Sequence, residues 1–293
     1  MQKLSPDRFR VKPGTRVKLA RWATDDTAPF TSGKAANRER KRTLETLFER
    51  QERLWAADRW SVLLVLQAPD AAGKDGTIEH VMRGLNPQGV RVTSFKSPSS
   101  EELDHDYLWR VHHAMPRRGS IGVFNRSHYE EVVVARVHPD ILAGQKLPRE
   151  RVTAHIWEER FEDINAMERH LWRNGTLIRK CFLHVSKGEQ LRRFLARLDE
   201  PAKQWKFSAD DLEKRKHWRD YERAYEDMLS ATSTDLAPWY IVPADKKWFM
   251  RLVVARILLD ALEHLNPQFP KVSAAERKTL AAIRRELQRG AKA

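Results

Sequence analysis

A short and continuous apolar run, Ser61-Val-Leu-Leu-Val-Leu-Gln67, constrains the fold of this chain more than any other feature. A run without polar alternation is typical of a strand that is buried on both faces of a parallel sheet. Four further candidate strands, at residues 90–95, 121–124, 176–185 and 239–242, alternate with helical patterns. This alternation indicates a three-layer α/β/α fold with a mostly parallel five-stranded sheet. Its ligand site is expected beyond the carboxyl ends of the strands.

The first strand runs into a loop of small residues and then a lysine, Ala68-Pro-Asp-Ala-Ala-Gly-Lys74, before a helix. In this pattern, typical of a phosphate-binding P-loop, backbone N–H groups and the helix N-terminus meet a phosphate while the lysine reaches its outer oxygens. The match to G-x-x-x-x-G-K-[ST] is partial, because Ala68 and Asp75 replace the first glycine and the Ser/Thr. A chance match in a turn is the alternative. Besides Lys74, the predicted phosphate-binding residues here are Ala72, Gly73, Asp75, Gly76 and Thr77.

A second polar cluster, Asn125-Arg-Ser-His-Tyr-Glu130, directly follows the third predicted strand. A polar residue at the end of a buried parallel strand points into the same crevice as the phosphate loop. Arg126 is therefore placed to neutralise phosphoryl charge during transfer. The alternative interpretation is a helix cap, in which Ser127 caps the next helix and Arg126 is solvated.

The balance of charges predicts a polyanionic partner. The chain has 54 Lys and Arg against 40 Asp and Glu, a net charge of +14, which suits nucleic acid, anionic lipid or a phosphate-rich substrate. Many basic residues fall in a long helical stretch at about 186–230. Within it Arg193 and Arg197 share a helix face, and Lys203 and Lys206 follow. We interpret this stretch as a helical lid over the ligand edge, although a solvated surface would also carry such charges.

The chain is expected to divide into a basic N-terminal arm (1–36), a P-loop kinase-like domain (37–270) with the lid inserted at 186–230, and a peripheral C-terminal helix (271–293). Helices are predicted at 44–55, 101–115, 127–137 and 152–172. The single Cys181 excludes a disulfide framework. No apolar run is long enough to cross a bilayer, so we expect a cytoplasmic protein with no membrane partner.

At this point the chain resembles the family-2 polyphosphate kinases from about Phe9 to Pro267. The resemblance lies in Asp70-Ala-Ala-Gly-Lys-Asp-Gly76, in Phe124-Asn-Arg-Ser-His-Tyr-Glu130, in Pro201-Ala-Lys-Gln-Trp-Lys206 and in Ala237-Pro-Trp-Tyr-Ile-Val-Pro-Ala-Asp245. The Asn-Arg-Ser-His-Tyr-Glu form is similar to the subgroup that acts on nucleoside mono- and diphosphates. Two departures are Asn125, where many relatives have Asp, and Pro69, which removes a backbone N–H from the loop.

The resemblance implies transfer of a phosphoryl group from inorganic polyphosphate to ADP or AMP, reversibly and with Mg²⁺. It implies that Asp70, Lys74 and Arg126 are catalytic, that Asp70 also holds the metal, and that the lid residues Arg193, Arg197, Lys203 and Lys206 bind phosphates. Nucleotide contacts are expected from Asn125, Ser127, Tyr129 and Glu130. A homo-oligomer, dimer or tetramer, is also implied.

Two alternatives from other classes remain open on the sequence. An ATP-dependent nucleotide or metabolite kinase would use the same P-loop. A nucleic-acid-binding protein would explain the net charge of +14, but the chain has no recognisable base-reading module, so no nucleic-acid partner is expected.

Overall fold

The computed structural model describes residues 4–205 and 207–290. Its centre is one sheet of five parallel strands in the order β2-β3-β1-β4-β5. The strands are β1 (Ser61–Gln67), β2 (Val90–Ser94), β3 (Ile121–Asn125), β4 (Thr176–His184) and β5 (Trp239–Pro243). The predicted α/β class is confirmed, and all the strand pairs of this sheet are parallel.

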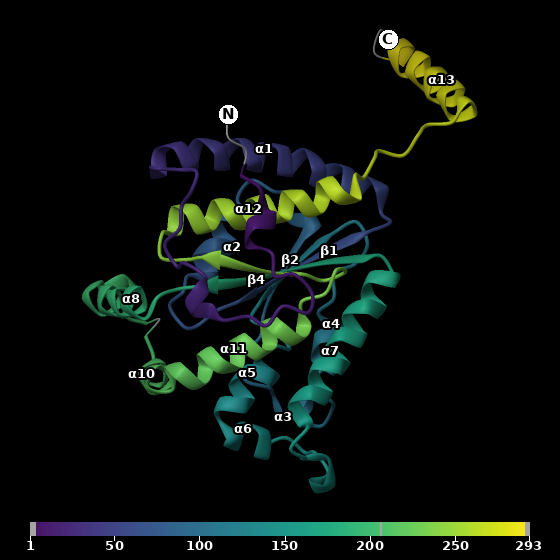
Figure 1. The fold of residues 1–293 in the computed structure, drawn as a ribbon. Coiled ribbons are helices and arrows are strands. Elements are labelled where there is room, and N and C mark those ends of the chain that lie inside the picture. The colour runs from purple at the N-terminus through teal and green to yellow at the C-terminus, as the bar shows by residue number, and fades with distance from the viewer. Residues whose placement is uncertain (1–3, 206, 291–293) are drawn as a thin grey trace.

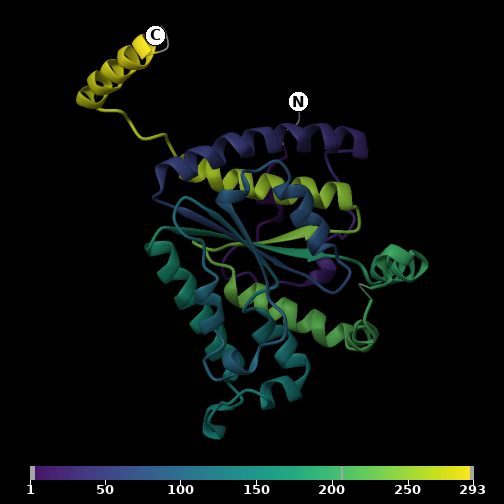
Figure 2. The ribbon, with the colours of Figure 1, turned by 180° about the vertical axis from the view of Figure 1, so that it is seen from behind.

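Helices cover both faces of the sheet (Figures 1 and 2). One face carries α1 (Gly33–Ala57), α2 (Lys74–Met82) and α12 (Lys247–Leu265), and the other carries α5 (Glu130–Val137), α7 (Ile156–Arg173) and α11 (Trp218–Thr232). Successive side chains of β1 point to opposite faces. Leu64 and Leu66 therefore join the core under α1 and α12, whereas Leu63 and Val65 join the core under α5, α7 and α11.

Several predicted helix bounds are corrected. Residues 101–115 form two short helices, α3 (Ser100–Leu103) and α4 (Trp109–His113), rather than one. Asp106 accepts a hydrogen bond from the backbone N–H of Leu108 at 2.9 Å, a local bond that competes with helix. The helix predicted at 127–137 begins at Glu130, because Arg126 has a left-handed φ of 64°. The remaining short elements are η1 (Pro6–Phe9), η2 (Leu19–Arg21), η3 (Pro87–Gly89), α6 (Pro139–Ala143) and η4 (Arg149–Arg151).

The N-terminal arm, predicted at 1–36, gives way to α1 at Gly33, and it is packed against β5 and α11. The backbone N–H of Val11 donates to the carbonyl of Trp239 at 2.9 Å, and the backbone N–H of Leu19 donates to Glu226 at 2.8 Å. At the other end of the chain, α13 (Ala274–Gly290) has no buried residue and stands apart from the body in Figure 1.

The predicted lid at 186–230 consists of two different parts. The helices α8 (Lys187–Asp199), α9 (Pro201–Gln204) and α10 (Ala209–Lys216) follow β4, and α8 and α10 project beyond the body in Figure 1. In contrast, α11 buries Met228 and Leu229 in the core beside α5 and α7. We therefore restrict the name lid to α8–α10.

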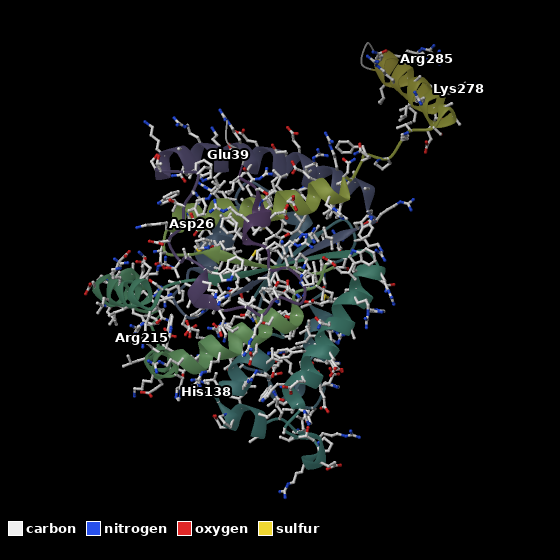
Figure 3. All side chains as sticks on the ribbon, in the orientation of Figure 1. Asp26, Glu39, His138, Arg215, Lys278 and Arg285 are labelled. Atoms are coloured by element: carbon white, nitrogen blue, oxygen red, sulfur yellow. The ribbon has the colours of Figure 1, made fainter. Side chains whose placement is uncertain are left out.

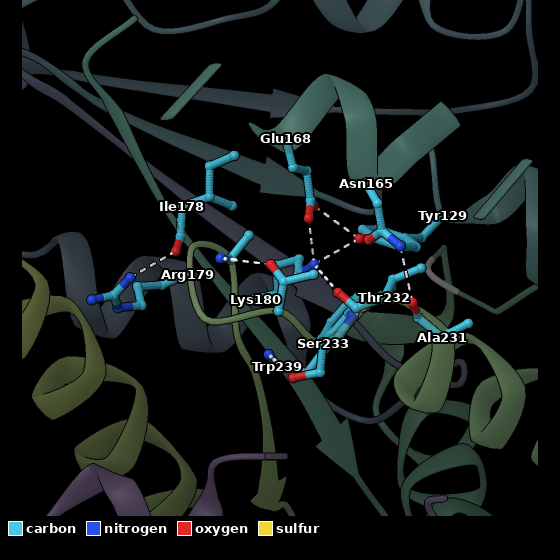
Figure 4. A network of polar contacts seen from close by, with 12 residues as sticks. Tyr129, Asn165, Glu168, Ile178, Arg179, Lys180, Ala231, Thr232, Ser233 and Trp239 are labelled. Atoms are coloured by element: carbon cyan, nitrogen blue, oxygen red, sulfur yellow. Dashed lines mark hydrogen bonds and ion pairs between the residues drawn. The ribbon is translucent and has the colours of Figure 1, made fainter. Parts of the chain in front are cut away.

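A buried network of polar side chains links β4 to the turn after β3 (Figure 4). The ammonium of Lys180, which is wholly buried, donates to Glu168 at 2.6 Å, to the carbonyl of Thr232 at 2.7 Å and to the hydroxyl of Tyr129 at 2.8 Å. The Tyr129 hydroxyl in turn donates to Glu168 at 2.8 Å. Each charge in this network is therefore paired and hydrogen-bonded, as burial requires.

His128, which adjoins this network, makes the stability of the protein depend on pH. Burial lowers its pKa to about 3, and the charge of Lys180 adds to the effect. Between about pH 6.5 and 3 the unfolded chain therefore binds a proton that the folded chain does not. The free energy of unfolding falls by up to about 1.4 kcal/mol per pH unit as the pH falls through this window.

We expect His128→Phe to make the loss of stability at acid pH shallower, because phenylalanine takes up no proton. The free energy of unfolding should be measured by urea titration at several pH values below neutrality. His170, which is exposed on α7, provides the control variant His170→Gln, for which the wild-type slope is expected. A wild-type slope in His128→Phe would contradict this role of the buried ring.

Candidate active site

Two left-handed residues shape the loop between β1 and α2. Ala71 has a φ of 60° and Gly73 a φ of 107°. A left-handed backbone costs a non-glycine residue about 1–2 kcal/mol, and such strain is concentrated at ligand sites. Gly73 is also crowded, since a Cβ there would lie 3.2 Å from Cε of Met250. The loop therefore curls tightly over the N-terminus of α2, where the backbone N–H groups have no partner within the helix.

Lys74 is the first residue of α2 and only 9% exposed. Its ammonium donates to the carbonyl of Ala68 at 2.9 Å and lies 3.5 Å from the carbonyl of Pro69. Burial and the charge of Arg126 lower its pKa, although Asp70 opposes this shift. A buried cation that rests on neutral carbonyls is placed to exchange them for the oxygens of a phosphate, which are stronger acceptors.

Asp70 and Arg126 form an ion pair across the mouth of the loop. Nη2 of Arg126 lies 2.9 Å from Oδ1 of Asp70. Burial by itself would raise the pKa of Asp70, but the charges of Lys74, Arg126 and Lys214 outweigh it and lower the pKa below the usual value. Asp70 is therefore ionised at neutral pH, and it orients the guanidinium of Arg126 beside Lys74.

Two helices of the lid contact Asp70 of this ion pair. Nζ of Lys214, on α10, lies 3.8 Å from Oδ2 of Asp70. Gln190, on α8, donates to the backbone carbonyl of Asp70 at 3.0 Å. Two lid helices thus contact Asp70, the loop residue that pairs with Arg126. A movement of the lid would therefore change the charge around the Asp70–Arg126 pair.

Asn125 ties the loop to the two neighbouring strands. Its amide donates to Asp75 at 2.7 Å and lies 3.4 Å from Oγ of Ser94 at the end of β2. Since Asp75 is in the first turn of α2, Asn125 fixes that turn against the carboxyl ends of β2 and β3. This contact orients the loop and gives the last residue of β3 a role in holding it.

A cavity with an aromatic wall opens beside Asp70 and Arg126. Trp218, Tyr221 and Tyr225 line it from α11, and Glu130 lines it from α5. Burial raises the pKa of Glu130, although the charges of Arg126 and Lys74 oppose this. Flat aromatic rings next to a cationic centre are suited to a ligand that carries an aromatic base on a phosphate.

Arg193, which was predicted to bind phosphate, contacts the backbone of the phosphate loop in this structure. Its guanidinium is buried and donates to the carbonyls of Ala72 at 2.5 Å, Ala71 at 3.2 Å and Ala244 at 2.6 Å. Its Nε donates to Glu189 at 2.9 Å, so in this conformation Arg193 links the backbone of the loop to α8. This bracing fixes the left-handed turn of the loop at Ala71.

The other predicted lid cations differ in their surroundings. Arg197 is half-buried and lies 3.7 Å from Asp211, and its charge contributes to lowering the pKa of Asp70. Lys203 is exposed and pairs with Glu200. Lys206 lies outside the described residues. Of the two predicted lid arginines, Arg197 is the one whose charge acts on Asp70.

Four more predicted contacts are corrected by burial or by hydrogen bonds. Tyr129 and Ser127 are wholly buried; Tyr129 belongs to the network of Lys180, and Ser127 accepts a hydrogen bond from Gln67 at 3.2 Å. Neither side chain is open to a nucleotide in this conformation. The N–H of Ala72 donates within the loop to the carbonyl of Pro69, and the N–H of Thr77 donates to Gly73 as the first hydrogen bond of α2. Phosphate contacts are therefore expected from the N–H groups of residues 73–76.

Sequence patterns missed several residues that surround the transfer centre. Lys214 lay in the basic run of the lid, and its charge was the one signal that could have found it. Gln190, Tyr221 and Trp218 carried no such signal, because they reach the centre through the packing of α8 and α11.

The described residues offer a divalent cation few ligands. In the ranges 4–205 and 207–290, no three His, Cys, Asp or Glu side chains are grouped closely enough to hold a metal ion. Mg²⁺ is commonly held by one or two carboxylates together with substrate phosphates and water. Asp70, ionised at the mouth of the phosphate loop, fits such a shared site.

Together, the three-layer fold, the loop that ends in Lys74 and the Asp70–Arg126 pair define a phosphotransferase of the P-loop kinase class. The family model for polyphosphate kinase 2 matches residues 31–270. No described helix has both the length and the apolar character needed to span a membrane.

Proteins that are similar in sequence and in structure support the same class of enzyme. The chain is 50% identical to the ADP-polyphosphate phosphotransferase of Rhodopseudomonas palustris, over 97% of this chain and 99% of that protein. It is 46% identical to the AMP/ADP-polyphosphate phosphotransferase of Meiothermus ruber, over 92% and 98%. The crystal structure of polyphosphate kinase 2 from Arthrobacter aurescens TC1 superposes with a TM-score of 0.86 at 40% identity, over 95% of this chain and 97% of that one. The chain belongs to the polyphosphate kinase 2 family and is an enzyme.

Proposed function

We propose that the protein transfers the terminal phosphoryl group of inorganic polyphosphate to ADP or AMP, reversibly and with Mg²⁺. The observation that carries this proposal is the meeting of Lys74, the Asp70–Arg126 pair and Lys214 at the mouth of the phosphate loop. The names of the relatives at 50% and 46% identity support the donor and the acceptors.

The step needs charge neutralisation more than proton transfer. An ionised oxygen of the acceptor phosphate forms a bond to the terminal phosphorus of the donor. The bond from that phosphorus to the bridging oxygen breaks, and its electron pair stays on the shortened chain. No general base is needed, because the attacking oxygen carries no proton. The obstacle is repulsion, about 1 kcal/mol for two unit charges 4 Å apart in water and about 4 kcal/mol near a protein surface.

The cations of the site are placed to offset this repulsion. Lys74 would hold the donor phosphates over the N-terminus of α2, and Arg126, oriented by Asp70, would neutralise the phosphoryl group in transit. Lys214 and Arg197 would add charge from the lid. The cavity lined by Trp218, Tyr221 and Tyr225 would take the nucleoside of the acceptor. Bound Mg²⁺, held by Asp70 and the phosphates, would supply further positive charge.

A direct assay tests the proposal. Purified protein is given long-chain polyphosphate, Mg²⁺ and either ADP or AMP, and the nucleotide products are separated by chromatography. ATP from ADP, or ADP from AMP, is expected, with no activity in the presence of a chelator. If ATP were a donor for AMP or a metabolite and polyphosphate were inert, the protein would be an ATP-dependent kinase of the same fold class.

Three further properties are part of the proposal. We propose that the protein is cytoplasmic, because its nucleotide acceptors are found there. We expect no affinity for nucleic acid beyond the non-specific attraction that its net positive charge produces. The resemblance to the family also implies a homo-oligomer, a dimer or tetramer. Light scattering coupled to size-exclusion chromatography measures that mass directly.

A further inference from the structure

A cluster of three basic side chains lies on the other side of the phosphate loop from the aromatic cavity. Lys247 and Arg251 are one turn apart on α12, and Arg40 comes from α1. We call Arg40, Lys247 and Arg251 the α12 strip. The helices α1 and α12 cover the face of the sheet opposite to α11, which carries the aromatic wall (Figures 1 and 2).

The strip borders the helix that begins at the phosphate loop. Nη2 of Arg251 lies 3.5 Å from the position that a Cβ on Gly76 would take, in the first turn of α2. Nη1 of Arg40 donates to the carbonyl of His80 at 3.4 Å, one turn further along the same helix. The strip is therefore continuous with the place where the donor phosphates are proposed to bind.

The acidic side chains near the strip are already paired with other cations. None of the three residues forms an ion pair with any described residue, and Nε of Arg40 and of Arg251 is buried without a hydrogen-bond partner there. The nearby acids are occupied, Glu79 by Arg83 at 2.6 Å and Glu189 by Arg193 at 2.9 Å.

The three cations also repel one another and their basic neighbours. Burial lowers the pKa of Arg251, and the charge of Arg40 lowers it further. The pKa of Lys247 is lowered by burial and then by Arg193 and Arg251. Cations that the fold holds close together, despite their repulsion, create a local positive potential, and this potential attracts a polyanion.

We propose that the α12 strip binds the distal phosphates of the polyphosphate donor, those behind the phosphoryl group that is transferred. This inference rests on the proposed function. In-line transfer places donor and acceptor on opposite sides of the phosphorus. If the nucleoside occupies the cavity beside α11, the rest of the donor chain leaves the loop on the opposite side, toward α1 and α12.

The test compares donors of different length on one variant. Lys247→Gln/Arg251→Gln is assayed with long-chain polyphosphate and with tripolyphosphate, each with saturating ADP. For the long chain we expect KM to rise about tenfold at constant kcat, and the slope of log KM against log salt to fall by about two, roughly one for each cation removed. KM for tripolyphosphate should rise much less than KM for the long chain, because three phosphates held at the loop reach only the end of the strip beside Gly76. KM for ADP should stay at the wild-type value.

The matched control is Lys278→Gln/Arg285→Gln, which removes the same charge from α13, away from the body (Figure 3). Wild-type KM values are expected for it. If Arg251→Gln prevents folding, the exposed Lys247→Gln alone should still raise KM for the long chain, by about threefold.

The outcomes distinguish the strip from the proposed function. An unchanged KM for the long chain, or an equal rise for tripolyphosphate, would overturn the strip while leaving polyphosphate as the donor. A wild-type protein that makes no ATP from either donor would overturn the proposed function, and the strip with it.

Discussion

Replacing Lys74 by methionine is expected to reduce the rate of phosphoryl transfer by about 10³-fold or more. A single preorganised charge or donor at the reacting phosphate contributes about 10²–10³-fold in comparable sites, and the cations of phosphoryl-transfer sites contribute up to about 10⁵-fold. Lys74 is the cation that starts the helix behind the loop, and it is bonded there only to neutral carbonyls. Methionine keeps the length and the apolar character of the stem and removes only the charge.

The fold should survive this change. Lys74 is buried next to Arg126, and burial together with that arginine lowers its pKa, so its charge is a cost to the folded state in the absence of substrate. The melting temperature of Lys74→Met is therefore expected to equal or exceed the wild-type value. The control is Lys216→Met on the lid, where the lysine is exposed and pairs with Glu213; its turnover should stay within about twofold of wild type. Wild-type turnover in Lys74→Met would remove the phosphate loop from the mechanism.

Replacing Lys180 by methionine should lower the free energy of unfolding by about 3–5 kcal/mol. The reason is the carboxylate that remains: Glu168 is buried and has Lys180 as its ion-pair partner at 2.6 Å. An unpaired buried charge is far more costly than the pair is stabilising. The carbonyl of Thr232 and the hydroxyl of Tyr129 lose a donor in the same variant (Figure 4). Urea unfolding monitored by tryptophan fluorescence measures the loss.

A second variant separates the loss of pairing from the loss of packing. In Lys180→Met/Glu168→Leu both charges are removed, so a large part of the lost stability should return. If the free energy of unfolding of Lys180→Met lay within about 1 kcal/mol of the wild-type value, Glu168 would be protonated or hydrated in the absence of Lys180. The ion pair would then not be what stabilises this part of the core.

The strands could be predicted from the sequence because each is a short segment rich in apolar or β-branched residues between helical patterns. The bounds of β1 were predicted to the residue, and the phosphate loop and Asn125–Arg126 were placed at the carboxyl edge where the structure has them. These features depend on local pattern and on the rule that parallel strands end at one edge.

The partners of individual side chains could not be predicted in this way. Spacing put Arg193 and Arg197 on one face of a helix, but it did not show that Arg193 meets the carbonyls of the loop while Arg197 faces Asp70. In the same way, the resemblance suggested a nucleotide contact for Tyr129, whereas the turn directs the tyrosine into the core. Such outcomes depend on tertiary packing between segments that are far apart in the sequence.

A crystal structure with tripolyphosphate and a nucleoside monophosphate tests most directly how the site binds its two substrates. We expect the terminal donor phosphate within hydrogen-bonding distance of Nζ of Lys74 and of the N–H groups of residues 73–76. The nucleoside should lie against Tyr221 and Trp218, with its phosphate beside Arg126. A donor bound away from the loop, or a base bound on the side of α12, would contradict both the mechanism and the direction proposed for the polyphosphate chain.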